Sequence, residues 1–150
     1  MPTWMVVEDE PDIYDVLLAM FELWGIEGVA FVDGGEAIAW VDAVDEGRVH
    51  GDLPELAIID IRLPEASGPE VANRIRRSTK LKDVAVVLIT AYRLSTEQEN
   101  EAIQTAGADR LMYKPLPAMP ELRSILDEIV KRRHTSATVQ PANDEKPPKS

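Results

Sequence analysis

The chain of 150 residues contains no cysteine, which removes several classes of function at once. Without thiols there can be no disulfide bonds, no thiolate nucleophile and no cysteine-bound zinc. The fold must therefore be stabilised by packing, and a hydrophobic content of 45% is enough for one domain with a substantial core. A reducing compartment is compatible with this composition, although the composition does not require one.

Long hydrophobic runs are also missing from the chain. The apolar run at residues 84–89 is among the longest, and it falls far short of the ~20 residues that span a bilayer. No basic segment followed by an apolar stretch opens the sequence, so no signal peptide is expected. These absences predict a soluble, cytoplasmic protein without a membrane partner.

Positive charge is scarce, because 16 basic residues face 27 acidic residues and the net charge is -11. Such a surface repels the phosphate backbone of nucleic acids and anionic lipids. We therefore expect no direct contact with nucleic acid. The ligand that this charge favours is a cation.

Strand-like and helix-like patterns alternate five times along the chain. Short apolar runs, typical of buried strands, occupy residues 4–7, 29–32, 56–59, 84–89 and 111–113. After each run, apolar residues recur at helical spacing, over residues 13–24, 38–44, 71–75, 95–106 and 122–130. Five such pairs in succession predict an α/β fold, in which helices flank both faces of a doubly wound parallel sheet.

Local signals describe the fourth helix and the end of the chain. Ser95 and Gln98 have the spacing of a capping box, and Gly107 is expected to terminate the helix that follows. This helix has few apolar residues, so we expect it to be loosely held and partly exposed. Later the composition becomes polar without periodicity, which predicts a folded domain at residues 1–133 and a disordered tail at 134–150.

Polar residues gather at the ends of the predicted strands. In an open parallel sheet, functional groups collect in the crevice at the carboxyl ends of the strands. These ends carry Glu8 and Asp9 after the first strand, Asp60 after the third, Thr90 after the fourth and Lys114 after the fifth. Folding is expected to bring these side chains together.

Three of these side chains are carboxylates, and a single lysine does not balance their charge. A divalent cation would balance it, and oxygen ligands without histidine or cysteine select Mg²⁺, Mn²⁺ or Ca²⁺ over zinc. With the cation bound, the site could accept an anionic phosphoryl group. Each residue alone has a plainer interpretation, since Asp60 could be a turn residue and Asp9 a helix cap.

Taken together and in this order, the motifs resemble the receiver domain of two-component response regulators. An acidic pair follows the first strand, Pro64 follows Asp60 by four residues, a hydroxyl ends the fourth strand, and Lys114 is followed by Pro115. The resemblance covers residues 4–133. It implies a flavodoxin-like sheet with the strand order 2-1-3-4-5.

The resemblance also implies a role for each acidic residue. Asp60 would be the phosphoacceptor, and Asp9 with Asp60 would ligate Mg²⁺. Glu8 would act mostly through a metal-bound water, and the backbone carbonyl of Arg62 would supply another ligand.

The remaining two site residues would contact the phosphoryl group itself. By the same resemblance, Lys114 would pair with a carboxylate and then with a phosphoryl oxygen, while Thr90 would hydrogen-bond another. These roles agree with the chemistry, because phosphoryl transfer needs an in-line nucleophile and fixed positive charge around the transferred oxygens.

The sequence departs from the family pattern where the phosphorylation state is usually read. The family usually has an aromatic residue three positions before the lysine, and here that position is Leu111. Tyr113 lies on the same strand face and is a candidate substitute. Movement of Thr90 toward the phosphoryl group would still pull the loop that begins with Ala91.

Two further residues lie next to the predicted site. Arg62 comes two residues after Asp60, and Tyr92 comes two residues after Thr90. In receivers such positions influence how readily water reaches the acyl phosphate. One hypothesis is that these two side chains stack across the mouth of the site and slow dephosphorylation. The other is that both are solvated loop residues.

The leading functional hypothesis is a signalling switch that accepts a phosphoryl group from a sensor histidine kinase or a histidine phosphotransfer protein. Its only catalysis would be its own phosphorylation and dephosphorylation. About 17 residues follow residue 133, too few for a DNA-binding output domain. Unless the chain is a fragment, we expect a stand-alone receiver whose output is protein contact through the fourth helix, fifth strand and fifth helix.

Two alternative functions stay open at this point. A receiver-like binding module would dock without phosphorylation, and the unusual Leu111 is compatible with it. A metal-dependent phosphatase would use an aspartyl intermediate on small substrates. Such enzymes typically have a second aspartate two residues after the nucleophile, where this chain has Arg62.

Overall fold

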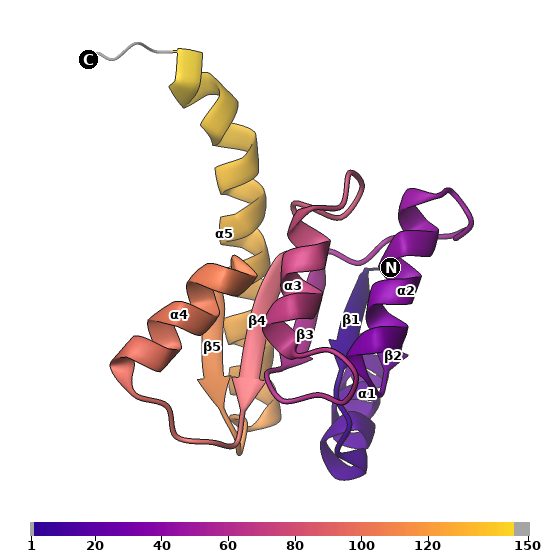
Figure 1. Cartoon of the computed structure of the whole chain (residues 1–150), viewed down its shortest axis with the longest axis vertical. Helices are drawn as coiled ribbons and strands as arrows, with labels where there is room; N and C mark the ends of the chain where they lie inside the picture. The colour runs from indigo at the N-terminus through magenta and orange to yellow at the C-terminus, as the bar shows by residue number, and fades with distance from the viewer. Residues whose placement is uncertain (1, 146–150) are drawn as a thin grey trace.

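The computed structural model describes residues 2–145, with side chains as far as residue 135. Within this range, five strands alternate with five helices (Figure 1). The elements are β1 (Thr3–Val7), α1 (Pro11–Trp24), β2 (Glu27–Phe31), α2 (Gly34–Asp45), β3 (Leu56–Asp60), α3 (Gly68–Arg76), β4 (Ala85–Thr90), α4 (Thr96–Ala106), β5 (Arg110–Tyr113) and α5 (Met119–Glu145). All strand pairs are parallel, in the order β2-β1-β3-β4-β5, which confirms the predicted fold and strand order.

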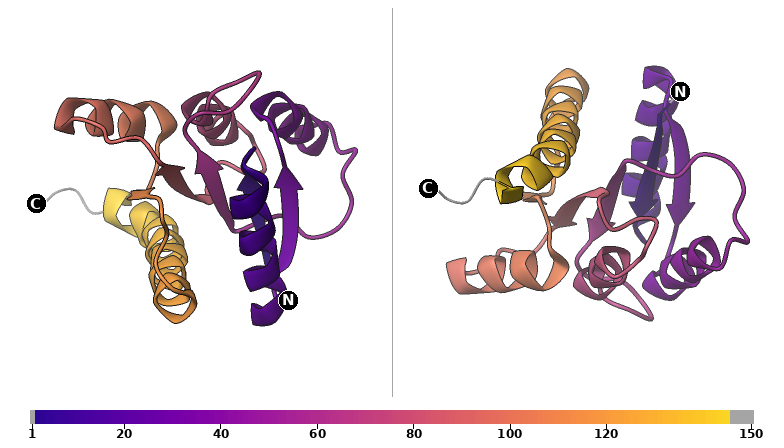
Figure 2. Two further views of the ribbon diagram at one scale, coloured as in Figure 1. Left: turned by 90° about the horizontal axis from the view of Figure 1, so that it is seen from below. Right: turned by 90° about the horizontal axis from the view of Figure 1, so that it is seen from above.

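The sheet separates two apolar cores because side chains alternate across each strand. Met5 and Val7 of β1 face the core that α2 and α3 cover, with Ala106 of α4 at its edge. Trp4 and Val6 face the opposite core, which α1 and α5 cover. The views along the sheet in Figure 2 show these two helical layers. Every residue of β1, β3 and β4 is buried, which explains their continuous apolar sequences.

The predicted start and end of α4 are confirmed. Ser95 and Gln98 form a reciprocal capping box, and Gly107 ends the helix in the left-handed conformation at φ 62°. In the described structure Ala106 is the one fully buried residue of this helix, so the expected exposure is also confirmed. No helix within residues 2–145 combines the length and the apolar character needed to cross a membrane.

The last helix extends beyond the residue at which we expected the folded domain to end. The sequence predicted a tail from residue 134 onward, whereas α5 continues to Glu145. The prediction depended on the missing apolar periodicity, which reports packing against the sheet and not local helical hydrogen bonding. The boundary at residue 133 stays a prediction, and the tail residues 146–150 lie outside the described residues.

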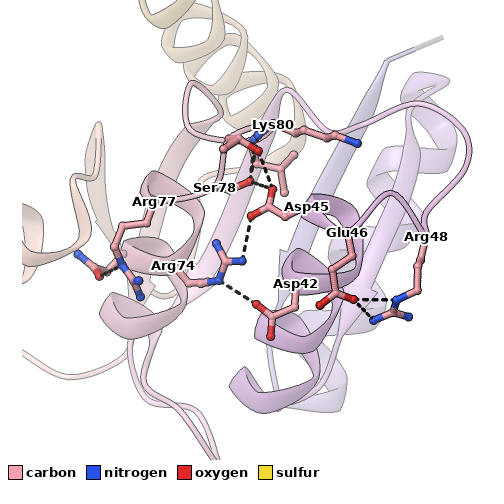
Figure 3. Close-up of polar contacts among 11 residues, drawn as sticks. Asp42, Asp45, Glu46, Arg48, Arg74, Arg77, Ser78 and Lys80 are labelled. Carbon is pink, nitrogen blue, oxygen red and sulfur yellow. Dashed lines mark hydrogen bonds and ion pairs between the residues drawn. The ribbon is translucent and has the colours of Figure 1, made fainter.

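A polar network joins α2 to the end of α3 on the surface of one layer (Figure 3). Arg74 of α3 donates to Asp42 and to Asp45 of α2, at 2.9 Å in both cases. The Ser78 hydroxyl also donates to Asp45, at 2.6 Å. Chiefly this hydroxyl, with the Arg74 guanidinium, holds the pKa of Asp45 below its ordinary value against the opposing effect of burial. The network therefore favours the ionised carboxylate.

We expect Asp45→Asn to lower the free energy of unfolding by about 1 kcal/mol near pH 7, because the charged acceptor for Arg74 and the Ser78 hydroxyl is lost. A lowered pKa stabilises the fold above the ordinary carboxyl pKa, and this contribution is lost as the pH falls through the folded-state pKa. The difference in the free energy of unfolding between Asp45→Asn and the parent protein should therefore disappear at about pH 2. Urea unfolding at both pH values measures it.

Asp42→Asn is the matched control, since its side chain is 47% exposed and contacts Arg74 alone among the partners above. It should cost less stability than Asp45→Asn. An equal gap for Asp45→Asn at both pH values would contradict a stabilising role of the ionised carboxylate.

Candidate functional site

The carboxyl ends of the strands bring the predicted site residues to one edge of the sheet. Asp60 is the last residue of β3, and β3 lies between β1, which leads into Glu8, and β4, which ends at Thr90. The register pairs Thr90 with Tyr113, the residue before Lys114. The topology thus gathers segments that are far apart in the sequence.

Three carboxylates form a compact acidic cluster at this edge. Oxygens of Glu8, Asp9 and Asp60 lie within 4.8 Å of one another. Glu8 is completely buried, Asp60 is 6% exposed, and Asp9 is exposed to solvent. The helix cap considered for Asp9 is not observed, because Glu10 occupies the N-cap position of α1. The sequence prediction that these carboxylates meet is confirmed.

Lys114 is the cation at the centre of the cluster. Its ammonium lies 2.7 Å from Asp60 Oδ2, 2.9 Å from Glu8 Oε1 and 2.6 Å from Glu10 Oε1. The lysine side chain is only 7% exposed. Glu10 is a site residue that the sequence analysis missed. Its signal was available, because it is the third member of the acidic run after β1, but many acidic runs are simply solvated.

Burial and ion pairing shift the pKa values of these groups in opposite ways. Burial raises the pKa of Glu8 to about 7, although the Glu10 backbone N–H and the Lys114 ammonium favour its charged form. Burial by itself would lower the pKa of Lys114. Hydrogen bonds to Asp60 and Glu10, together with the ion pair to Glu8, outweigh burial and raise the pKa of Lys114 above its ordinary value. Lys114 is therefore a fixed positive charge.

The donor set suits a hard divalent cation such as Mg²⁺. Among the described residues Glu8 Oε1 is buried and accepts no hydrogen bond, and its contact with the Lys114 ammonium at 2.9 Å is an ion pair. A buried carboxylate oxygen in this state is a strong candidate ligand. Glu8, Asp9 and Asp60 offer only oxygen, which Mg²⁺ prefers. The residues present therefore fit the ion.

The backbone around Asp60 is fixed by close packing. Asp60 Oδ1 accepts a hydrogen bond from the Arg62 N–H at 2.9 Å, which holds the turn after β3. Gly68, at the start of α3, packs against this turn, and a Cβ there would lie 2.2 Å from the Asp60 carbonyl oxygen. Only glycine allows this approach, so the start of α3 packs directly against the end of β3.

A pocket of about 280 Å³ opens over the cluster and is lined by Asp9, Glu10, Asp60, Arg62, Ala91, Tyr92 and Lys114. The Arg62 guanidinium lies 3.9 Å from the centre of the Tyr92 ring, so the predicted stacking of these two side chains is present. Thr90 is 1% exposed, and its hydroxyl accepts from the Tyr92 N–H at 3.1 Å. In this structure the threonine therefore holds the loop, and Ala91 and Tyr92 line the pocket.

The two β5 positions discussed for readout have different surroundings. Leu111 is half-buried and packs against the core under α2 and α3. The Tyr113 hydroxyl donates a short hydrogen bond to Glu99 of α4 and accepts one from the Leu94 N–H at 3.3 Å. The hydrogen bond that the hydroxyl donates to Glu99 is the main cause that raises the pKa of Tyr113. Tyr113 thus connects β5 to the loop before α4 and to its first turn.

Formal charges around the pocket sum to zero once a divalent ion is counted. Among the described residues at this edge, four carboxylates come from Glu8, Asp9, Glu10 and Asp60, and two cations come from Arg62 and Lys114. The sequence analysis counted three carboxylates and one cation. Glu10 and Arg62 add opposite charges, so the conclusion that a divalent ion neutralises the site is unchanged.

Sequence comparison finds the same family that the site geometry suggests. The family model of the response regulator receiver domain matches residues 4–127. The polar-differentiation response regulator DivK of Brucella anthropi is 29% identical over 112 residues, which are 75% of this chain and 83% of DivK. The phosphate regulon transcriptional regulatory protein PhoB of Rhizobium meliloti is 30% identical over 132 residues, 88% of this chain and 53% of PhoB.

Solved structures of receiver domains have the same fold. A CheY-like receiver domain from Methanospirillum hungatei matches with a TM-score of 0.74 at 22% identity, over 91% of this chain and 98% of that one. The receiver domain of a sensor histidine kinase from Pseudomonas aeruginosa matches with a TM-score of 0.71 at 25% identity, over 87% of this chain and 98% of that one. That structure has a magnesium ion coordinated in its active-site cleft. The chain described here therefore belongs to the family of response regulator receiver domains, the receiving modules of two-component signalling.

Proposed function

We propose that this receiver accepts a phosphoryl group on Asp60, with Mg²⁺, from a sensor histidine kinase or a histidine phosphotransfer protein. The observation that carries the proposal is the position of the Asp60 carboxylate. It lies at the base of an open pocket, 2.7 Å from a buried ammonium and within 4.8 Å of two further carboxylates. The cytoplasmic location expected from the sequence is part of this proposal.

The transfer exchanges one bond to phosphorus for another. An Asp60 oxygen attacks phosphorus as the P–N bond of the phosphohistidine breaks, and the donor imidazole keeps the electron pair and takes up a proton. Lys114 donates to a phosphoryl oxygen and offsets its charge. Glu8, Asp9 and Asp60 would hold Mg²⁺, which supplies further charge stabilisation when bound. Hydrolysis of the acyl phosphate resets the switch.

The residues around Asp60 favour this function over a small-substrate phosphatase. A phosphatase of that kind needs an acid and base beside the nucleophile. Arg62 occupies the position two residues on, and its guanidinium stacks on Tyr92. A guanidinium offers N–H donors and no acceptor atom, so Arg62 cannot take the role of the aspartate that such a phosphatase has at this position. A phosphorylation-independent binding module stays the alternative, and the intact acidic cluster is the observation against it.

The output is proposed to pass through α4, β5 and α5. Tyr113 supports this route, since it pairs with Thr90 in the sheet, precedes Lys114 and binds both Leu94 and Glu99. Movement of Thr90 or Lys114 toward a phosphoryl group would displace these contacts. The weakly buried α4 is the element that such a displacement shifts most easily.

The first prediction tests phosphorylation itself. Incubation with Mg²⁺ and a small phosphodonor should add one phosphoryl group by intact mass, stable in acid and labile in base. Asp60→Asn should remove the adduct, whereas Asp42→Asn, in the surface network, should keep it. Absence of an adduct in the parent protein favours the binding module, and rapid multiple turnover on phosphate esters favours the phosphatase.

The second prediction concerns the stacked pair at the pocket mouth. Arg62→Ala removes the group that covers Tyr92 and should shorten the lifetime of the phosphorylated form by about two- to fivefold, because water gains access. Loss of a radiolabelled phosphoryl group over time measures this lifetime. Arg77→Ala, at the exposed residue that follows α3, is the control. An unchanged lifetime in Arg62→Ala would rule out shielding.

The third prediction concerns the connection to α4. Tyr113→Phe removes the hydroxyl that binds Glu99 and Leu94, so phosphorylation should persist while the response of α4 is reduced. Amide hydrogen exchange over residues 91–105, with and without beryllium fluoride, reports that response. Tyr14→Phe on α1 is the control. A full response in Tyr113→Phe would show that the readout takes another route.

A further inference from the structure

Glu10 occupies an unusual position for a residue at the start of a helix. It is the N-cap of α1, yet its side chain makes no capping hydrogen bond. Its carboxylate instead accepts from Lys114, a residue 104 positions away in the sequence, at 2.6 Å. The Glu10 side chain is 57% exposed, whereas that of Lys114 is 7% exposed. Glu10 therefore reaches from the solvent side to the cation of the site.

We propose that Glu10 competes with the phosphoryl group for Lys114 and so weakens the binding of phosphoryl anions in the pocket. This inference rests on the proposed function, because it assumes that a phosphoryl group enters the pocket. It assigns Glu10 as a positioning residue whose charge sets how strongly the site holds that group.

The argument begins with the donors of the lysine. The Lys114 ammonium donates hydrogen bonds to Glu10 and Asp60 and forms an ion pair with Glu8 at 2.9 Å, so three carboxylate oxygens surround its three N–H groups. A phosphoryl oxygen that approaches the ammonium must therefore compete with at least one of these oxygens for its charge. Glu8 is completely buried and Asp60 bears the phosphoryl group, so neither can withdraw into water. Glu10 can, because its side chain is already largely solvated.

The net charge of the pocket also predicts that Glu10 weakens the binding of anions. With a divalent ion counted, the charges at this edge sum to zero when Glu10 is included. Without Glu10 the pocket would carry one net positive charge. An anion binds more tightly to a positive pocket than to a neutral one, and the difference shrinks as salt screens an exposed charge. Glu10 therefore opposes the anion through both its charge and its bond to Lys114.

The test uses Glu10→Gln, which keeps the size of the side chain and removes its charge. With saturating Mg²⁺, the variant should bind beryllium fluoride about two- to fivefold more tightly than the parent protein, the range expected for a partly exposed ion pair. Added salt should narrow this gap. Glu10→Asp keeps the charge and should stay close to the parent, as should Glu22→Gln at the other end of α1. Isothermal titration calorimetry measures each affinity.

Affinity for Mg²⁺ alone separates competition from damage to the pocket. Removal of a negative charge should leave Mg²⁺ binding equal or weaker in Glu10→Gln, while beryllium fluoride binding becomes tighter. If Glu10→Gln lost affinity for both Mg²⁺ and beryllium fluoride, Glu10 would only support the structure of the pocket. An unchanged affinity for beryllium fluoride would also overturn the inference. If the parent protein binds no beryllium fluoride, or if Asp60→Asn binds beryllium fluoride as tightly as the parent protein, the proposed function fails instead.

Discussion

The buried ammonium of Lys114 is the interaction on which the whole site depends. Four carboxylates meet at one edge of the sheet, and one of them, Glu8, is completely buried. Like charges at these separations oppose the folded state unless a cation lies among them. Lys114 supplies that cation from the end of β5. The ammonium also lies 2.7 Å from Asp60 Oδ2, close enough to contact a group bound to that carboxylate.

The site is rigid on one side and adjustable on the other. Beneath Asp60, every residue of β1, β3 and β4 is buried, and Gly68 lets α3 approach the Asp60 backbone closely. Toward β5, the loop before α4 is held by hydrogen bonds to Thr90 and Tyr113, and α4 buries little of its own surface. The proposed phosphorylation switch would use this asymmetry, because it requires a rigid site connected to an element that moves at low cost.

The family match and the departures from its pattern belong together. The acidic cluster, the lysine and the strand order are those of a receiver domain. Leu111 takes the place of the usual aromatic residue, while Tyr113 makes polar contacts with the start of α4. Glu10 and Arg62 add opposite charges around the pocket. Under the proposed function, these differences would change the strength and lifetime of the phosphorylated state without changing the chemistry that forms it.

The sequence by itself determined the element order, the buried strands and the residues at the strand ends. Apolar spacing and capping residues such as Ser95 are local signals, and the parallel topology then places Asp9, Asp60 and Lys114 at one edge. Equal offsets of two residues beyond the ends of β3 and β4 suggested that Arg62 and Tyr92 stack, but the sequence left solvated side chains equally open, and the structure decided for stacking. The other features depend only on the spacing of residues along each segment and on their positions at the strand ends.

Only the tertiary structure decided which side chains pair across the site. Glu10 binds Lys114 and Tyr113 binds Glu99 because the strand register, side-chain length and burial place those atoms within hydrogen-bond distance. None of these quantities appears in the spacing of a single segment. The continuation of α5 to Glu145 likewise escaped prediction, since apolar periodicity reports contact with a core and not the local backbone bonds that prolong a helix.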